Sequence, residues 1–349
     1  MSIEGKDFLE RGSRGFPQSC GLAVAAFGER VGQMDTTGIL NLPESVSPEG
    51  RYLLGISGGR DSVALLGLLV EAGFGDLVLC HLNHELRGDE SDADAALVRD
   101  LAGELGLPVK VGNRAVSDLA QAAGLSVEAA ARQARLEFFV QCAGDFGTNR
   151  VFLAHHANDQ AETVLINLIR GSGSRGLGAM EPATMIQVGE SELELIRPLL
   201  HVERDQIPMP PKFREDESNA SNAFLRNRIR HRLIPEIENQ SRRPLIPALL
   251  RTAEILGEED RFLETVLEER FDVHQDELRV PDLRALPVAL QRRAIHNWLS
   301  FLRIPNIGFE EIERVRGLIE PGAKVAKINL PADRHVRRRE KRLFVEPTQ

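Results

Sequence analysis

The feature that most constrains the fold of this chain is a regular alternation of short apolar runs with longer amphipathic runs after residue 51. The apolar runs have the length of strands and cover 52–56, 77–82, 108–111 and 150–154. The longer runs have helical periodicity and cover 61–72, 91–106, 126–143 and 159–170. Strands that alternate with helices form a parallel sheet with helices on both faces. The alternation therefore predicts an α/β fold built on a doubly wound parallel sheet.

The rest of the chain differs in pattern. Residues 1–50 lack sustained periodicity and are rich in Gly, Ser and Pro, which predicts a loosely ordered N-terminal extension. The sheet domain is expected over 51–205, followed by a linker and a basic helix over 206–240. Residues 241–349 show helical periodicity and end in two strand-like segments around a Pro-Ala-Asp turn, which predicts a helical second domain ending in a small β element.

Composition excludes several classes of protein. With 349 residues, of which 42% are hydrophobic, the chain can build two or three cores and is neither disordered nor fibrous. Its apolar runs are shorter than the ~20 residues that cross a bilayer, and its first residues are too charged for a secretory signal. A cytoplasmic location without membrane contact is therefore expected. Cys20, Cys80 and Cys142 are too dispersed for a disulfide framework, a zinc ribbon or an iron–sulfur cluster.

A glycine-rich turn, GISGGRDS at 55–62, joins the first strand to the first helix. It matches the G-x-S-x-G elbow of hydrolases, which would make Ser57 a nucleophile, but that elbow normally follows several strands and needs an oxyanion loop upstream. A tight turn without chemistry would explain the glycines but not Ser57, Ser62 and Asp61. A phosphate cradle explains them all, because open backbone N–H groups, a helix N-terminus and hydroxyl groups all bind phosphate oxygens.

Asp61 adds a second constraint on this turn. A carboxylate beside a phosphate repels it unless a cation lies between them, which predicts Mg²⁺ at Asp61. The Gly-Lys-Ser/Thr ending of ordinary P-loops is absent, which excludes the common kinases and GTPases.

Two further motifs follow strands and should meet this turn, because ligands of such sheets bind beyond the carboxyl ends of the strands. These motifs are HLNHELRG at 81–88 and HHANDQAET at 155–163. Their histidines fit nucleotide contacts as well as zinc, and they lack the H-E-x-x-H frame of a helical zinc site. The four histidines are His81, His84, His155 and His156.

Asp159 and Glu162 are three residues apart and therefore share one face of the predicted helix. Carboxylates at a helix start are favourable with or without a ligand. Downstream, basic side chains crowd 226–232 and again 334–342, although the whole chain carries a net charge of −9. Each basic cluster fits either an exposed face or a local RNA footprint, because arginine contacts to phosphate give nucleic-acid affinity.

The SGGRDS sequence resembles the SGGxDS loop of the N-type ATP pyrophosphatases, or PP-loop enzymes, which cleave ATP to AMP and pyrophosphate. Further motifs extend the resemblance to the tRNA(Ile)-lysidine synthase family over about 50–236. They are HLNHELRG, EAAARQAR at 128–135, HHANDQAET, RGSGSRGLGAM at 170–180, IRPLL at 196–200 and DESNASNAFLRNRIRHRLIP at 216–235. The chain departs from the family pattern at Asn158, where an aspartate is usual, at Leu136, where an aromatic residue is common, and in a short 207–216 span.

The resemblance implies a sheet of the adenine nucleotide alpha hydrolase type and the substrates ATP, free L-lysine and tRNA(Ile) with a CAU anticodon, with Mg²⁺ as cofactor. It implies adenylation of the C2 oxygen of the wobble cytidine, followed by attack of lysine with loss of AMP. A homodimer is left open. A PP-loop tRNA thiolase is an alternative, although the Cys-x-x-Cys pairs typical of thiolases are missing, and a catalytically silent tRNA-binding relative is another.

The site residues predicted with the help of this resemblance fall into overlapping groups. The nucleotide-binding group is Ser57, Gly58, Gly59, Arg60, Asp61, Ser62, His81, His84, His155 and His156. The catalytic group is Asp61, Arg132, Arg135, Asp159 and Glu162. The group for lysine, tRNA or the adenylate is Asp159, Glu162, Arg226, Arg228 and Arg230, and the metal ligand is Asp61.

Overall fold

The computed structural model describes residues 38–85, 89–215 and 225–347. The chain divides into two compact units, 1–253 and 254–349, and each unit has its own hydrophobic core. The sequence placed the start of the second domain at residue 241, whereas the boundary between the two units along the chain falls within helix α10 (Ile246–Glu268).

The first unit contains the predicted strands and helices, together with the unpredicted helices α4 and α7 and a hairpin after α7. Its strands are β1 (Tyr52–Gly55), β2 (Leu77–Asn83), β3 (Val109–Asn113), β4 (Arg150–Phe152), β5 (Ala183–Val188) and β6 (Ser191–Ile196). Its helices are α2 (Arg60–Glu71), α3 (Asp89–Leu105), α4 (Val116–Ala123), α5 (Val127–Phe146), α6 (Ala157–Ile169), α7 (Ser174–Leu177), α8 (Leu225–Arg228), the π-helix η2 (Ile229–Leu233) and α9 (Ile234–Ser241).

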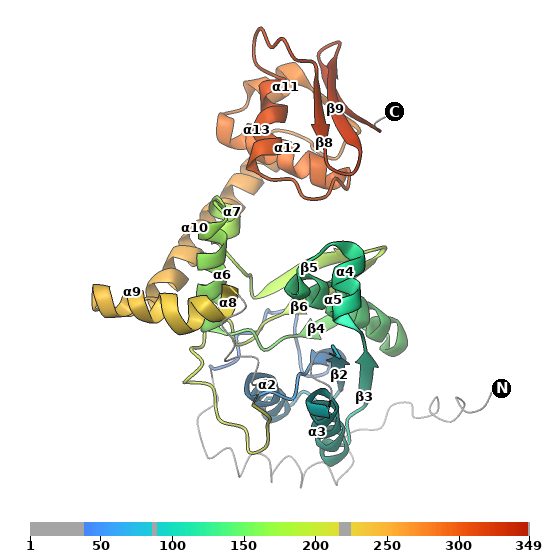
Figure 1. Ribbon diagram of the computed structural model, residues 1–349, viewed down its shortest axis with the longest axis vertical. Helices are drawn as coiled ribbons and strands as arrows, with labels where there is room; N and C mark the ends of the chain where they lie inside the picture. Colours follow the sequence, from blue (N-terminus) through green and yellow to red (C-terminus); the bar gives the residue numbers. More distant parts are fainter. Residues whose placement is uncertain (1–37, 86–88, 216–224, 348–349) are drawn as a thin grey trace, which may run out of the picture. The chain divides into compact units, whose positions relative to one another are not determined.

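The sheet of the first unit has the strand order β3-β2-β1-β4-β6-β5 (Figure 1). All neighbouring strands run parallel except β5, which pairs antiparallel with β6 at one edge. The predicted parallel α/β sheet is therefore confirmed. The chain leaves β1 toward β2 and later returns to β4 on the other side of β1, so the order reverses between β1 and β4. Ligands of open α/β sheets bind at such a switch point, beyond the carboxyl ends of the strands.

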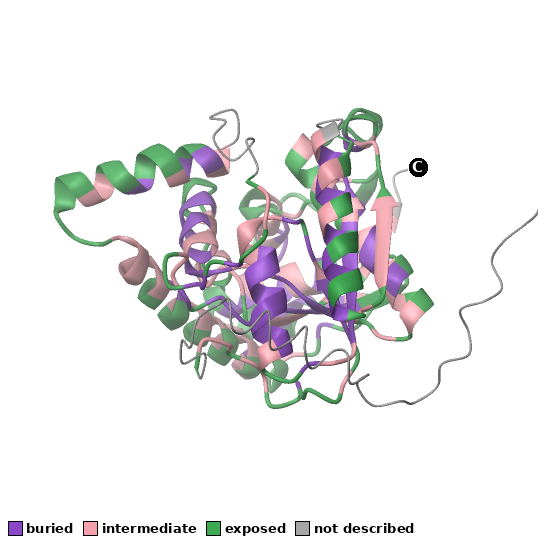
Figure 2. Ribbon diagram, turned by 90° about the horizontal axis from the view of Figure 1, so that it is seen from below, coloured by how far each residue is buried: buried purple, intermediate pink, exposed green. Residues whose placement is uncertain are grey.

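Helices cover both faces of the sheet because successive strand residues point in opposite directions. On one face, Tyr52 and Leu54 of β1 belong to a cluster with the buried side of α2 and with α3. On the other face, Leu53 packs in a cluster with Phe138 and Phe139 of α5. Figure 2 shows the central helix and the centre of the sheet as buried, whereas the edge strand β3 is intermediate and the outer helix faces are exposed. Burial on both faces explains why the central strands β1 and β2 are mostly apolar.

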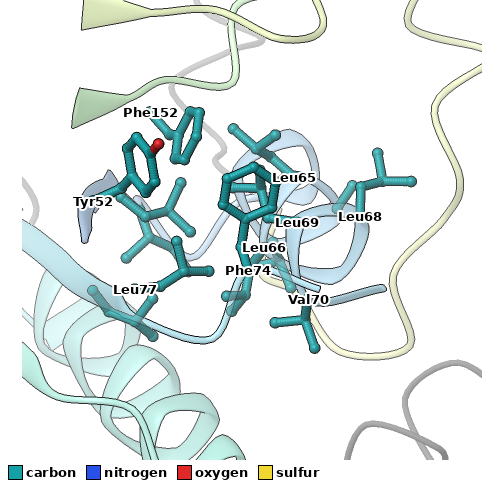
Figure 3. Close-up of a cluster of buried hydrophobic side chains, with 14 of the residues drawn as sticks. Tyr52, Leu65, Leu66, Leu68, Leu69, Val70, Phe74, Leu77 and Phe152 are labelled. Atoms are coloured by element: carbon teal, nitrogen blue, oxygen red, sulfur yellow. The ribbon is translucent and has the colours of Figure 1, made fainter. Parts of the chain in front are cut away.

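Three aromatic rings anchor the core under the switch point (Figure 3). The ring of Tyr52 lies 5.5 Å from that of Phe74 and 4.7 Å from that of Phe152, and the Phe74 and Phe152 rings are 5.5 Å apart. Such pairs stabilise a core by roughly 0.5–1.5 kcal/mol each beyond their buried area. The Tyr52 hydroxyl also donates a hydrogen bond to the carbonyl of Ser47 at 3.0 Å. These contacts hold the first residue of β1 against the last residue of β4.

Part of the predicted N-terminal extension contributes to this core. Val46 is buried, and the backbone N–H of Asn41 donates a hydrogen bond to the carbonyl of Pro198 at 2.9 Å. Residues 38–50 thus pack against the sheet, while 1–37 lie outside the described residues.

The second unit combines helices with a small antiparallel sheet, as predicted. Its elements after α10 are β7 (Glu277–Arg279), α11 (Val280–Ala285), α12 (Val288–Phe301), α13 (Phe309–Gly317), β8 (Lys327–Leu330), β9 (Arg334–Arg339) and β10 (Arg342–Pro347). The sheet order is β7-β10-β9-β8. The strands β8 and β9 flank the predicted Pro-Ala-Asp turn, whereas β7 and β10 are strands that the sequence did not predict. Trp298 is fully buried in this unit and donates its indole N–H to the carbonyl of Gln275 at 3.0 Å.

Across the described part of the chain, none of the helices combines the length and the apolar character that a membrane span requires.

Candidate functional site

The turn between β1 and α2 is braced by its two serines. The Ser57 N–H donates to Ser62 Oγ at 3.2 Å, the Gly59 N–H donates to Ser57 Oγ at 3.2 Å, and Ser62 Oγ donates to the Gly59 carbonyl at 3.0 Å. Gly58 has φ +87°, which only glycine adopts readily. The partners of Ser57 Oγ in the described residues are Ser62 Oγ and the Gly59 N–H, and neither is a base. This geometry fits a phosphate cradle and does not fit a nucleophilic serine.

The start of α6 faces this turn across the switch point. His156 Nε2 lies 3.7 Å from Asp61 Oδ2 and 3.5 Å from Asp159 Oδ2, so one buried imidazole lies close to both carboxylates. The His156 N–H donates to Asp159 Oδ2 at 3.1 Å, which caps the helix. Burial acts to raise the pKa of Asp61, but contacts with His156 and Arg204 outweigh it, and the pKa lies below its ordinary value. Asp61 is therefore anionic at neutral pH.

Asp159 and Glu162 lie on one face of α6, as predicted, and both are paired with arginine. Arg230 Nε lies 2.5 Å from Glu162 Oε1, and Arg230 Nη2 lies 3.2 Å from Glu162 Oε2 and 3.0 Å from Asp159 Oδ1. Arg226 Nε lies 3.4 Å from Glu162 Oε2. Glu162 is fully buried, and its pKa is raised because burial outweighs the attraction of Arg230. Two carboxylates thus face two guanidinium groups.

The arginines reach α6 because α8 and η2 pack against it. Ile229 and Ile234 are buried against Leu165 and Ile166 of α6. Arg226 and Arg230 project from this packed segment toward the carboxylates, whereas Arg228 is exposed. The π-helical turn at η2 fits a functional role, because such turns are frequent at functional sites. Sequence reasoning grouped the three arginines, and the structure separates them.

The four predicted histidines have different surroundings. His81 is buried, and its Nδ1 lies 2.9 Å from the Ile56 carbonyl, so Nδ1 carries the proton and Nε2 is left as an acceptor. Burial lowers the pKa of His81. The pKa of His155 is lowered to about 3, mainly because the side chain is buried. Nearby arginines lower this pKa further, whereas the negative charge of Asp159 raises it. The His84 carbonyl accepts the Val116 N–H at 3.3 Å.

Zinc gains no support from this arrangement. Within 38–85, 89–215 and 225–347, there is no group of three or more His, Cys, Asp or Glu side chains placed to hold a metal ion. A single carboxylate such as Asp61 still fits Mg²⁺, which commonly takes one or two protein carboxylates together with substrate phosphates.

Positive charge gathers beside His155. Arg132 and Arg135 of α5 are exposed, and their charges act on neighbouring basic groups. Arg197, at the end of β6, is buried and donates from Nη1 to the Glu181 carbonyl at 2.7 Å. Burial and then the charge of Arg132 lower the pKa of Arg197 to about 10. Sequence reasoning missed Arg197 as a site residue, although a lone arginine within the otherwise apolar stretch IRPLL at 196–200 was the available signal.

Arg60 does not direct its side chain to the cradle. Its Nη2 donates to the carbonyls of Arg204 at 2.9 Å and Ile207 at 3.1 Å. The Arg214 N–H donates to the Gly58 carbonyl at 3.0 Å. The segment 203–215, which includes the start of the linker predicted over 206–240, is therefore attached to the cradle at two points.

The comparisons with known proteins agree with this geometry. A family model described as a PP-loop domain matches residues 33–237, and one described as a TilS substrate binding domain matches residues 278–344. A tRNA(Ile)-lysidine synthase from Gloeobacter violaceus is 38% identical over 286 residues, which cover 78% of this chain and 83% of that protein. The chain belongs to the tRNA(Ile)-lysidine synthase family.

Other members of the tRNA(Ile)-lysidine synthase family match to a similar degree. The protein from Geobacter sulfurreducens is 36% identical over 302 residues, which cover 82% of this chain and 63% of that protein. The protein from Chlorobaculum tepidum is 34% identical over 284 residues, which cover 77% of this chain and 82% of that protein. The chain thus spans less than two thirds of the Geobacter relative. The resemblance that the sequence motifs indicated is confirmed.

Proposed function

We propose that this chain ligates lysine to C2 of the wobble cytidine 34 of tRNA(Ile) with a CAU anticodon, and that ATP is converted to AMP and pyrophosphate. The observation that carries the proposal is the contact between the two halves of the crevice. His156 lies within 3.7 Å of Asp61 at the cradle and within 3.5 Å of Asp159 on the acidic face. A nucleotide on the cradle and a cation on α6 would therefore be neighbours.

ATP is the nucleotide that the PP-loop family assignment implies. The Gly58 turn and the N-terminus of α2 would bind its phosphates, because helix N-terminal N–H groups and their dipole favour anions. Asp61 would hold Mg²⁺, and its lowered pKa keeps it ionised for that purpose. When bound, the ion would neutralise phosphate charge. His81 Nε2, a buried acceptor, suits a donor group of the nucleoside.

The proposed reaction has two displacements. The C2 oxygen of cytidine attacks the α-phosphorus, the bond to the bridging oxygen breaks, and its electron pair leaves with pyrophosphate. The lysine ε-amine then attacks C2, and AMP departs with the C2 oxygen. Arg132 and Arg135 would stabilise the charge on the adenylate, as preorganised cations do for developing anions.

The lysine amine would be held by Asp159 and Glu162. Free lysine is mostly protonated at neutral pH, so the ammonium group binds to carboxylates and must lose a proton before it attacks. Arg230 holds both carboxylates in the structure, with three contacts of 2.5–3.2 Å. We therefore infer that Arg230 moves to a phosphate of the adenylate or RNA when lysine enters.

The names of the relatives support tRNA as the nucleic acid, and so does the TilS substrate binding model over 278–344. In the second unit, exposed arginines on β9 and β10 offer phosphate contacts. They are Arg334, Arg337, Arg339 and Arg342. A cytoplasmic location and a homodimer stay predictions.

The proposal is tested by incubating the protein with ATP, labelled lysine and a CAU-anticodon tRNA(Ile) transcript. ATP-dependent entry of label into RNA is expected, with no label in a transcript whose C34 is replaced by uridine. The Asp61→Asn variant should lose this activity and keep RNA binding. Absence of label with pyrophosphate release would contradict the lysine assignment. Absence of both with retained RNA binding would identify a silent relative, and a thiolated product would identify a thiolase.

A further inference from the structure

The segment 203–215 is built into the nucleotide cradle. Its two ends are attached to the turn, one through Arg60 and the other through the bond between the Arg214 N–H and the Gly58 carbonyl. Arg214 Nε also lies 2.7 Å from Asp94 Oδ1, and Asp94 packs beside Gly58. Ile207 is buried in the main core, and Phe213 packs against it. A segment so firmly held presents its side chains to the cradle in a defined place.

Both backbone polar groups of Arg204 are hydrogen bonded to side chains of other elements. Its N–H donates to Asn158 Oδ1 at 2.9 Å, and its carbonyl accepts from Arg60 Nη2 at 2.9 Å. The N–H of Ala157, next to Asn158, donates to the Val202 carbonyl at 2.9 Å. The backbone of Arg204 is thus attached both to the first turn of α6 and to the first residue of α2.

The side chain of Arg204 then reaches the metal-binding carboxylate. Its Nε lies 3.3 Å from Asp61 Oδ1, and 39% of the side chain is exposed. No hydrogen bond joins its Nη groups to the described residues of the chain, so the outer edge of the guanidinium is available to a ligand. A planar guanidinium with free N–H groups matches the oxygens of a phosphate.

We propose that Arg204 binds the β- and γ-phosphates of ATP and donates hydrogen bonds to pyrophosphate as it leaves. This inference rests on the proposed function. When the bond between the α-phosphorus and the bridging oxygen breaks, the electron pair stays on pyrophosphate, and a guanidinium beside it stabilises that charge. A cation at Asp61 would repel Arg204 and favour its turn from the carboxylate to the phosphates. Asn158 is a positioning residue for Arg204.

This role gives Asn158, at which the sequence departs from the motif pattern described above, a definite place in the site. The Arg204 N–H needs an acceptor oxygen at this place, and an asparagine side chain provides one as well as an aspartate does. The departure at Asn158 therefore leaves the position of Arg204 intact.

The test compares Arg204→Ala with Lys212→Ala, an exposed position on the same segment that pairs with the exposed Glu104. Binding of inorganic pyrophosphate with Mg²⁺ is measured by calorimetry on the full chain, and RNA-dependent pyrophosphate release from ATP is measured separately. Arg204→Ala should bind pyrophosphate at least about tenfold more weakly and lower kcat by about 100-fold, with a smaller change in KM for ATP. Lys212→Ala should match the wild type in both.

Wild-type affinity for pyrophosphate in Arg204→Ala would overturn the assignment. Should Arg204→Ala fold poorly, Arg204→Gln decides, because glutamine can still hydrogen bond to Asp61 but carries no charge. The same loss of pyrophosphate affinity is then expected, and unchanged affinity would refute the role. The calorimetric comparison needs neither RNA nor lysine. It therefore separates failure of this inference from failure of the proposed ligase function, which the lysine incorporation assay reports.

Discussion

Replacement of Arg230 by glutamine should destabilise the first unit in a way that free lysine repairs. Arg230 is the main partner of Glu162, a carboxylate with no solvent exposure, and also contacts Asp159. Removing one partner of a buried pair costs roughly 3–5 kcal/mol. Arg226 remains 3.4 Å from Glu162, so the lower end of this range, about 3 kcal/mol, is expected for Arg230→Gln.

The pH dependence of this loss has a defined sign. Burial already raises the pKa of Glu162, and loss of Arg230 raises it further. A carboxyl whose pKa is higher in the folded state destabilises that state as the pH rises from its unfolded value toward its folded value. The difference in the free energy of unfolding between wild type and Arg230→Gln should therefore be largest at neutral pH. It should shrink as the pH falls toward about 4.5.

The assay is urea unfolding with and without lysine. Lysine at 100 times its dissociation constant should stabilise Arg230→Gln by about 2.7 kcal/mol, because it binds the folded state alone. Norleucine, which lacks the ε-amine, should have no such effect, and wild type should respond weakly because Arg230 occupies the carboxylates. Arg228→Gln, at an exposed position two residues away, is the matched control. Equal lysine responses in wild type and Arg230→Gln would refute the idea that Arg230 holds the lysine site.

Three further changes test other parts of the site. Gly58→Ala should lower the free energy of unfolding by about 1–2 kcal/mol, because a φ of +87° strains alanine. Gly103→Ala in α3 should not destabilise the protein, because alanine favours a helix and its Cβ atom meets open space. Thermal unfolding measures both variants. Asn158→Asp should keep pyrophosphate release close to that of the wild type, and Asn158→Ala should reduce it, because only the former keeps the acceptor for Arg204. Since the folded-state pKa of His155 is about 3, the unfolded chain takes up its proton first, and stability should fall by up to about 1.4 kcal/mol per pH unit below pH 6.5. His155→Gln should flatten that decline in unfolding measurements between pH 7 and 4.5, and an unchanged slope would show that His155 is not responsible.

The parallel sheet could be predicted because burial on both faces makes its strands apolar runs bounded by helices. β1, β2 and α2 begin at or within one residue of their predicted starts. The β5–β6 hairpin was missed because ELELI alternates polar with apolar residues, unlike the central strands β1 and β2, and because the hairpin lies at one end of the sheet. The strand β7 was missed for a related reason, since three residues carry too little periodicity to be recognised.

The meeting of the cradle with α6 followed from topology, because a reversal of strand order brings the ends of β1 and β4 together. The hydrogen bonds that attach 203–215 to the cradle could not be predicted from topology. They join segments more than 140 residues apart, and their acceptors are backbone carbonyls, which every residue carries. The pairing of Arg230 with Glu162 was equally hidden. A basic cluster looks the same in sequence whether it faces RNA or an acidic helix of its own chain.

The central claim is that the cradle at the switch point activates RNA, and ATP labelled at the α-phosphate tests it most directly. With a CAU-anticodon tRNA(Ile) transcript and no lysine, the label should become attached to the RNA, and addition of lysine should release it as AMP. Asp61→Asn should give no labelled RNA. If AMP forms while the RNA never carries the label, or if the label is transferred to lysine, the cradle does not adenylate RNA and the account is wrong.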